Sequence, residues 1–251
     1  MDLAIGEVTV WRVLVTPASS RAAEAARGIL DDEESARAGA FRRDVDRALY
    51  LVAHVALRTV LGVVLDMPAR KVVLGRAACP GCGGPHGRPR TLGGGPVEFS
   101  LSHTGGMALI ALARDAVGVD VAQRATFDEA RGLNIAARLH PAERAVLAEL
   151  PSARTAAATL RCWVRKEAYL KATGIGLAAG ADSVYVGPGP DHPVAPGAGP
   201  VPAEPVGWGF ADVPVADRWA AAVALSLPNG VVSLRVRAGE FDLESGILSS
   251  Y

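Results

Sequence analysis

Residues 163–177 (WVRKEAYLKATGIGL) combine a carboxylate and two ammonium groups in a segment whose apolar pattern predicts a helix. At 3.6 residues per turn, Trp163, Glu167 and Lys171 fall on one face. Lys166 and Lys171 are two of only three lysines among 26 lysine and arginine residues. A compact ammonium on a flexible stem is therefore favoured there over a planar guanidinium. The alternative is a solvated face with a Glu-to-Lys pair that contributes only about 0.3–0.5 kcal/mol.

A second carboxylate lies in a short predicted strand, residues 117–121 (VGVDV). Asp120 shares one face of that strand with Gly118 and Ala122. An aspartate that faces a core is costly unless it is paired or binds a metal, whereas on a solvated edge it costs little. If the helix that carries Glu167 packs across this strand, the two carboxylates converge. Such a pair suits Mg²⁺, which keeps several waters and accepts phosphate oxygens from a substrate.

Composition bounds the possible classes of function. The 251 residues are 50% hydrophobic and 21% charged, which predicts a folded chain with a substantial core. A formal net charge of zero argues against nucleic-acid binding. The three cysteines are too few for a disulfide framework and fit a reducing compartment. No secretion signal and no apolar run of about 18 residues is recognised, so we expect a cytoplasmic protein without membrane contact.

The order of predicted elements favours an α+β fold. Helices are expected to begin near the acidic residues 31–34, near Asp44, at Pro141 and near Ala153, and strands are expected at residues 8–15, 99–103, 107–113, 117–121, 219–227 and 231–236. Residues 107–113 and 117–121, separated by a turn, predict an antiparallel pair. The Pro- and Gly-rich residues 187–207 predict a long exposed loop.

Two long predicted helices suggest an internal duplication. One is expected to end at Gly62 and the other at Gly174, which lie 174 − 62 = 112 positions apart, close to half the chain. This spacing predicts two similar halves, each with strands packed on a long helix.

The motifs together resemble the signature set of the Sfp-type 4′-phosphopantetheinyl transferases. The resemblance covers nearly the whole chain, and although each motif alone is weak, their order and spacing together are specific. The segments that carry it are residues 41–47 (FRRDVDR), 86–89 (HGRP), 99–103 (FSLSH), 118–121 (GVDV) and 163–177.

The resemblance implies a monomeric pseudo-dimer of two α+β halves, residues 1–116 and 117–251, with the active site in the cleft between them. Such an enzyme uses Mg²⁺ to transfer the 4′-phosphopantetheine arm of coenzyme A to a serine of an apo acyl or peptidyl carrier protein. The other product is adenosine 3′,5′-bisphosphate.

The resemblance also implies roles for residues at matching positions. Asp120 and Glu167 would bind Mg²⁺, and Glu167, directly or through water, would take the proton of the attacking serine. Lys171 would stabilise phosphoryl charge, and His103 would act with it in catalysis. The expected coenzyme A contacts are Arg37, Arg88, Ser102, His103, Lys166 and Lys171, with Arg88 at the adenosine end.

One position departs from the family pattern. Many members have a second carboxylate two residues after the strand aspartate, where this chain has Ala122. Gln123 is adjacent, but in a continuing strand it points to the opposite side. Water is therefore the expected third ligand, and we expect Mg²⁺ to bind more weakly without loss of activity.

Two alternatives stay open. Cys79, Cys82 and His86 resemble part of a zinc site, which would suit a small zinc-dependent binding module, but a structural zinc site needs four ligands. Without metal, the same segment is a tight Gly/Pro loop that presents Arg88. The other alternative is a family member that binds coenzyme A or a carrier protein without turnover, for which Ala122 would be the sign.

Overall fold

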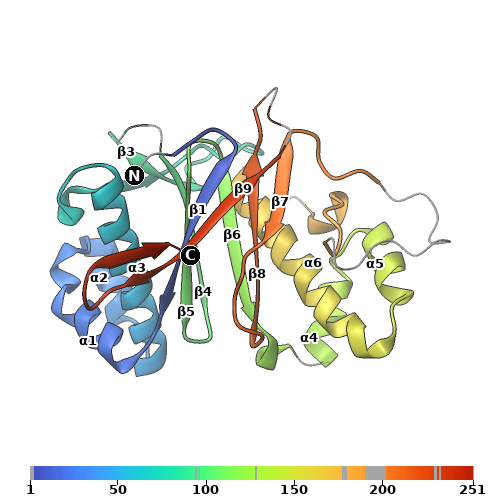
Figure 1. The fold of residues 1–251 in the computed structure, drawn as a ribbon, viewed down its shortest axis with the longest axis horizontal. Helices are drawn as coiled ribbons and strands as arrows, with labels where there is room; N and C mark the ends of the chain where they lie inside the picture. Colours follow the sequence, from blue (N-terminus) through green and yellow to red (C-terminus); the bar gives the residue numbers. More distant parts are fainter. Residues whose placement is uncertain are drawn as a thin grey trace.

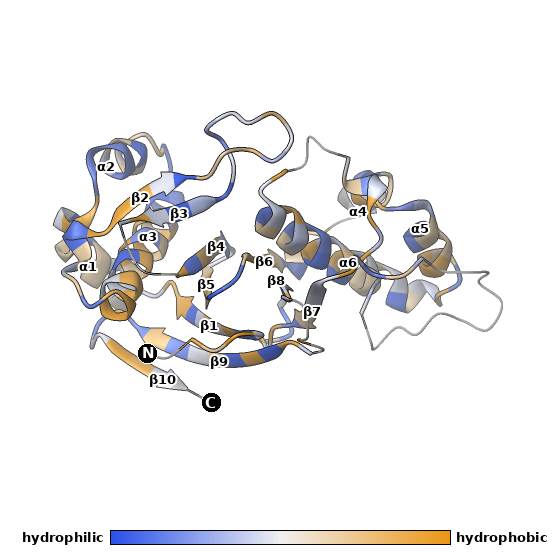
Figure 2. Cartoon of the chain, turned by 90° about the horizontal axis from the view of Figure 1, so that it is seen from above, coloured by the Kyte–Doolittle hydropathy of each residue, from blue (hydrophilic) through white to orange (hydrophobic). Residues whose placement is uncertain are grey.

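The computed structural model describes residues 3–93, 95, 97–127, 129–176, 180–189, 202–228, 231 and 233–250. Its centre is formed by strands, and a group of helices covers each side (Figure 1). The helices α1 to α3 lie on one side and α4 to α6 on the other, and the view from above in Figure 2 shows the same arrangement. The fold is therefore α+β, as the sequence predicts.

The first half forms a sheet with the strand order β10-β9-β1-β5-β4. β1 pairs antiparallel with β5, and β5 pairs antiparallel with β4. The elements up to β5 are β1 (Glu7–Leu14), α1 (Pro17–Ala25), α2 (Asp32–Gly39), α3 (Asp44–Val64), the separate hairpin β2 (Val73–Arg76) and β3 (Pro89–Leu92), β4 (Glu98–Thr104) and β5 (Met107–Ala113).

The second half repeats the topology of the first. Its sheet has the order β6-β8-β7, so the first strand again pairs with the last strand of a hairpin that follows the helices. The elements are β6 (Val117–Gln123), α4 (Glu129–Ala136), α5 (Pro141–Ala148), α6 (Ser152–Thr173), β7 (Trp208–Asp212) and β8 (Trp219–Ser226). Short 3₁₀ turns lie at Arg27–Ile29, Ala69–Lys71, Arg124–Thr126 and Ala181–Ser183.

Local sequence explains where the helices begin and end. The Asp31 side chain accepts the N–H of Glu34, whose side chain accepts the N–H of Asp31, so a reciprocal capping box starts α2. His140 and Glu143 form the same arrangement at α5, with a proline in the first turn. α6 ends at Gly174, whose φ of 75° is the left-handed conformation that glycine adopts without strain.

Two expectations from the sequence are wrong in detail. β5 and β6 do not pair with each other, because β5 lies between β1 and β4 whereas β6 pairs with β8. Gly62 does not end α3, which continues to Val64; a Cβ at Gly62 would lie 2.9 Å from the Met67 carbonyl oxygen, so the glycine allows a close approach.

The last strands also change the division of the chain. The predicted strand at 231–236 is instead β9 (Arg235–Asp242), which lies parallel to β1, and β10 (Ile247–Ser250) pairs with β9. Residues 235–250 thus belong to the first sheet, and not to the second half where a boundary at 116/117 puts them. Leu177 and residues 190–201 of the predicted loop lie outside the described residues.

By length and composition alone, α3 is long and apolar enough to cross a membrane, although the sequence shows no fully apolar run of that length. However, 61% of its most apolar window is buried within the protein. Its buried apolar side chains belong to the larger hydrophobic core, together with Trp11, Phe99, Ile110 and Leu112 of the first sheet. This is the environment of a core helix.

Candidate active site

The two sheets meet where β4 lies beside β6, and serine side chains join them. The backbone N–H of Val119 donates to the Ser100 hydroxyl at 3.1 Å, and that of Val121 donates to the Ser102 hydroxyl at 3.3 Å. Side-chain oxygens of β4 thus take the place of the backbone carbonyls that would satisfy β6 in a continuous sheet. The start of the second half is fixed against the last part of the first sheet.

α6 crosses β6 at very short range because the strand presents small residues to it. A Cβ at Gly118 would lie 1.9 Å from the Ala168 carbonyl oxygen and 2.7 Å from the Ala172 nitrogen. Only glycine fits at that distance. This contact brings the cleft-facing turns of α6 next to Asp120, which is the packing on which the convergence of Asp120 and Glu167 depends.

Asp120 is held by two donors. Its Oδ1 accepts the Ser102 hydroxyl at 2.9 Å and the Lys171 ammonium at 2.6 Å. Lys171 also donates to the Val119 carbonyl at 3.2 Å. Because the Asp120 side chain is 12% exposed and that of Lys171 is 33% exposed, the ion pair is still open to the cleft.

Glu167 lies one turn before Lys171 on α6 and has an altered acidity. Burial and the negative charge of Asp120 raise the pKa of Glu167 to about 7, although Lys171 and Arg138 oppose that shift. Among the described residues, no hydrogen-bond partner of its carboxylate is found. A carboxylate with this pKa accepts or releases a proton near neutral pH.

The cavity around these groups has a volume of about 390 Å³ and is mostly polar. β4, β6 and α6 all contribute to it, so it lies between the two halves. It is lined by Leu101, Ser102, His103, Thr104, Asp120, Val121, Ala122, Gln123, Thr126, Trp163, Glu167 and Lys171.

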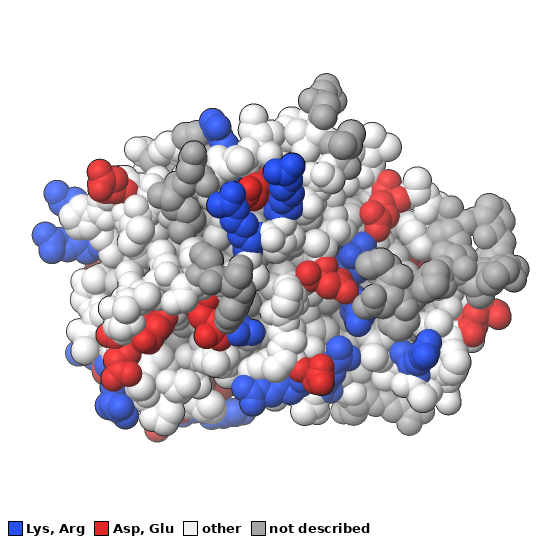
Figure 3. Space-filling view, viewed as in Figure 1, with Lys and Arg blue, Asp and Glu red and all other residues white. Residues whose placement is uncertain are grey.

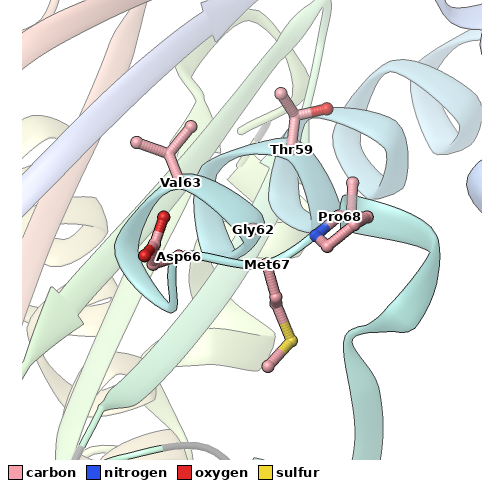
Figure 4. Close-up of a pocket in the computed structure, with 7 residues that line it drawn as sticks. Thr59, Gly62, Val63, Asp66, Met67 and Pro68 are labelled. Carbon is pink, nitrogen blue, oxygen red and sulfur yellow. The ribbon is translucent and has the colours of Figure 1, made fainter.

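Another hollow, of about 570 Å³, lies at the C-terminal end of α3 (Figure 4). Asp66 is the single titratable side chain among its lining residues. The smaller cavity between the halves, with four titratable side chains (His103, Asp120, Glu167 and Lys171), is therefore the candidate active site.

His103 extends the site along β4. Desolvation in the concave site lowers the pKa of His103, and the positive charges of His54, Lys171 and Arg37 lower it further. Arg37, which also lies 6.0 Å from the centre of the Tyr50 ring, is thus close enough to His103 to influence it. However, Arg37 is not one of the residues that line the cavity.

Arg88 lies at the end of the β2–β3 loop and contacts the end of α6. A Cβ at Gly174 would lie 3.0 Å from the Arg88 nitrogen. The Arg88 guanidinium pairs with Glu98 at the start of β4. Arg88 therefore borders the same junction of β4 and α6, outside the cavity lining.

Lys166 does not belong with the expected coenzyme A contacts. Its ammonium is fully buried, lies 2.8 Å from the Glu143 carboxylate and donates to the Val184 carbonyl. One position along a helix rotates a side chain by about 100°, so Lys166 points away from the face that carries Glu167. We therefore assign Lys166 to the packing of α6 against α5.

The structure also adds residues that the sequence motifs did not indicate. Gln123, the last residue of β6, lines the cavity, contrary to the expectation that it points to the opposite side. Thr126 lines it from the following 3₁₀ turn. Ser100 positions β6, and the alternating serines of residues 99–103 were the available signal for it.

Asp120 and Glu167 suit a magnesium ion. The donor set consists of hard carboxylate oxygens in a polar, water-accessible cavity. The influence of Asp120 on the acidity of Glu167 shows two negative groups whose repulsion a cation would relieve. Ala122 supplies no third carboxylate, so water and substrate oxygens would complete the coordination.

Charged side chains of both signs are interspersed on the face that Figure 3 shows. Figure 3 shows basic and acidic groups mixed over one face, without a large area of one sign. This agrees with the zero net charge.

Comparison with known proteins agrees with these motifs. The sequence model of the 4′-phosphopantetheinyl transferase superfamily matches residues 116–201. The chain is 30% identical over 184 residues to the 4′-phosphopantetheinyl transferase HetI of Nostoc sp., a match covering 71% of this chain and 73% of that protein. It is 28% identical over 162 residues to the putative 4′-phosphopantetheinyl transferase slr0495 of Synechocystis sp.. That match covers 63% of this chain and 62% of the relative, so it leaves more than a third of the relative unmatched.

Proposed function

The chain belongs to the 4′-phosphopantetheinyl transferase superfamily, and on that premise we propose that it transfers 4′-phosphopantetheine from coenzyme A to a serine of an apo acyl or peptidyl carrier protein. The observation that carries the proposal is the convergence of Asp120, Glu167 and Lys171 in one cavity between the halves. Phosphoryl transfer needs positioning and charge stabilisation rather than a covalent enzyme intermediate.

The reaction replaces one phosphorus–oxygen bond with another. The serine oxygen bonds to the phosphorus that bears the pantetheine arm, and the bond from that phosphorus to the bridging oxygen of the diphosphate breaks. Adenosine 3′,5′-bisphosphate leaves with the bonding electrons, and the serine proton goes to Glu167, directly or through a water. The pKa of about 7 allows Glu167 to take up this proton near neutral pH.

Lys171 supplies positive charge to the transferring phosphoryl group. It is the cation that both lines the cavity and pairs with Asp120, so its ammonium is oriented before substrate binds. His103 and Ser102 offer hydrogen bonds to coenzyme A phosphates from the β4 side. Arg88 and Arg37 lie farther out and would meet the adenosine end of coenzyme A and its phosphates.

Mg²⁺ held by Asp120 and Glu167 would neutralise diphosphate charge in this site. Ser102 keeps the Asp120 carboxylate oriented for that role through its hydroxyl. Ala122 in place of a further acid leads us to expect weaker Mg²⁺ binding with retained activity.

A loading assay tests the proposed function. The protein, coenzyme A and Mg²⁺ are incubated with apo carrier domains of fatty-acid, polyketide and peptide-synthetase type, and the carrier mass is measured. The expected result is the mass gain of one phosphopantetheine on at least one carrier. The Glu167→Gln variant should lower the rate by about 10²–10⁴.

Glu149→Gln is the matched control, because Glu149 is exposed at the end of α5 and outside the cavity. This variant should load carriers at the wild-type rate. Binding of coenzyme A without any mass gain on the carriers would overturn the proposal and favour the non-catalytic alternative.

We propose that the protein acts as a cytoplasmic monomer. Cys79, Cys82 and Cys162 are all free thiols, as in a reducing compartment. Both halves of the candidate site come from one chain, so a second copy is not needed to complete it.

A further inference from the structure

The loop between β2 and β3, residues 77–88, brings three potential metal ligands together. The Cys79 and Cys82 sulfurs and a His86 ring nitrogen lie within 4.8 Å of one another. The Cys82 sulfur is 3.0 Å from His86 Nε2. In a tetrahedral zinc site, Zn–S bonds of about 2.3 Å and Zn–N bonds of about 2.0 Å put ligand atoms roughly 3.6–3.8 Å apart. Small side-chain movements would therefore bring all three atoms to one ion.

The backbone holds this arrangement independently of any metal. The Cys79 N–H donates to the Gly84 carbonyl at 2.7 Å, and the Gly83 N–H donates back to the Cys79 carbonyl at 2.8 Å. Gly83 has a φ of 72°, a left-handed conformation that favours glycine. The tight turn thus sets the direction of both cysteine side chains.

The same turn points the backbone N–H groups of Cys82 and Gly81 at the Cys79 sulfur. Their dipoles stabilise a thiolate, which is the form that binds metals. Cys79 is buried, whereas Cys82 and His86 are exposed, so an ion could enter from solvent.

We propose that Cys79, Cys82 and His86 bind one Zn²⁺ ion, with water as the fourth ligand. Thiolates and an imidazole favour zinc over the magnesium expected at the carboxylates. The two thiols would release their protons to solvent as zinc binds, and His86 would bind through a neutral ring nitrogen. Among the described residues no further cysteine, histidine or acid joins the cluster, so water is assigned to the fourth position.

The bound ion would fix the loop that carries Arg88. Gly87 follows His86 directly, and a Cβ there would lie 2.6 Å from the Ala77 carbonyl oxygen, so the two arms of the loop are in close contact. The Ala77 N–H donates to the Arg88 carbonyl at 2.9 Å. Zinc would therefore hold Arg88 against Gly174 and Glu98 through the base of the loop, as a structural clip beside the active site.

Metal content tests the proposal directly. The full-length chain without a histidine tag is purified without chelator, and its zinc is measured by mass spectrometry. The expected result is about one zinc per chain, falling more than tenfold in Cys79→Ser and in Cys82→Ser. Cys162→Ala, which removes the cysteine outside the cluster, should retain the zinc.

Two further readouts separate metal binding from misfolding. Cobalt added to the metal-free wild-type chain should give the visible bands of tetrahedral Co²⁺ and sulfur-to-metal charge-transfer bands. Removal of zinc should also expose residues 76–90 to trypsin. A chain with less than a tenth of an equivalent of zinc and no cobalt bands, or a Cys79–Cys82 disulfide in the protein purified under reducing conditions, would overturn the site. Unchanged trypsin cleavage after removal of zinc would show that the ion does not fix the loop that carries Arg88.

Discussion

The long helices α3 and α6 occupy corresponding places in the two halves, but they lie on different surfaces. α3 packs against large residues, among them Trp11, Phe99 and Ile110. α6 packs against Gly118 and a row of alanines at positions 122, 220, 222 and 224. Small residues let the α6 backbone approach its strands closely, so groups from helix and strand can meet. The same order of elements therefore supplies the larger core in the first half, whereas in the second half it brings Asp120, Glu167 and Lys171 to the cavity between the halves.

The halves also share a buried ion pair between the long helix and a short one. In the first half, Arg58 contacts Glu34 at 2.5 Å, and Glu34 is the third helical residue of α2. In the second half, Lys166 contacts Glu143 at 2.8 Å, and Glu143 is the third helical residue of α5. Each basic residue follows its glutamate by nearly the same number of positions. Both halves thus use the same kind of ion pair to fix the long helix to a short one. Because Lys166 serves this purpose, it is absent from the cavity.

The next positions along each helix show where the halves diverge. Glu167 and Lys171 follow Lys166 by one and five residues, and Thr59 and Val63 follow Arg58 by the same steps. In Figure 4, Thr59 and Val63 border the hollow at the end of α3, where they offer one hydroxyl and no charge. Of these two corresponding helices, α6 alone presents a carboxylate and an ammonium at these steps among the described residues.

The largest expected effect comes from breaking the ion pair between Lys166 and Glu143 in the second half. Lys166→Met leaves the fully buried Glu143 carboxylate without its cation, and we expect the free energy of unfolding to fall by about 3–5 kcal/mol. Urea unfolding at pH 7 measures this loss. The double variant Lys166→Met/Glu143→Leu, which removes both charges, should be more stable than the single variant.

Lys171→Met is the matched comparison on the same helix. Lys171 is 33% exposed, so this change should leave the urea midpoint nearly unchanged but lower the loading rate by about 10²–10³. A large loss of stability in Lys171→Met with wild-type activity would contradict this assignment, because it would show that Lys171 stabilises the fold and does not take part in the reaction.

A smaller effect is expected from closing the space between α6 and β6. Gly118→Ala adds a Cβ where the Ala168 carbonyl already lies, and overpacking of this kind costs about 1–3 kcal/mol. If the helix moves away to relieve the contact, Asp120 and Glu167 separate, so the rate should fall more than stability alone explains. Loading rates and urea midpoints are compared with Gly28→Ala, since a Cβ at Gly28 meets nothing within 4 Å. Equal loading rates in Gly118→Ala and Gly28→Ala would show that the close approach of α6 to β6 does not determine the positions of Asp120 and Glu167.

Local sequence was sufficient for five strands, β1, β4, β5, β6 and β8, whereas β2, β3, β7 and β10 were not predicted and β9 was misplaced. The alternation around Asp120 and the helical spacing of Glu167 and Lys171 are properties of a few adjacent residues, and they predicted which face of the strand or helix carries each group. The convergence of these groups was expected only on the condition that α6 packs across β6. The position of Lys166 depends on Glu143, which comes from another helix, and no local pattern reveals that partner. The same limit applies to β9, because its pairing with β1 joins residues more than 200 positions apart.

The ion pair of the first half should respond to acid. Burial raises the pKa of Glu34, but hydrogen bonds with His54 and Arg58 and the charge of Arg58 outweigh it, and the pKa is lowered from 4.5. A lowered pKa gives stability that is complete above the unfolded value and is lost as the pH falls through the folded value.

As the pH falls below 4.5, the free energy of unfolding of the wild type should therefore decrease by about 1 kcal/mol more than that of Glu34→Gln. Urea midpoints across the acid range measure the two slopes. Glu33→Gln, an exposed neighbour on α2, should follow the wild-type curve. Parallel curves for wild type and Glu34→Gln would show that the ionisation of Glu34, in its pair with Arg58, does not contribute to the acid dependence of stability.

The smallest expected effect is a shift in the titration of His103, which lies where the two halves meet. Desolvation and the charges of His54, Lys171 and Arg37 lower its pKa from 6.5, so in the free protein the imidazole is neutral at pH 7. A bound phosphate offsets those positive charges and favours the imidazolium. Adenosine 3′,5′-bisphosphate should therefore raise the pKa, and the His103 ring signal, assigned with His103→Asn, reports it by NMR. Since Arg37 and His54 come from the first half and Lys171 from the second, a titration that the nucleotide leaves unchanged would mean that the two halves do not share one phosphate site.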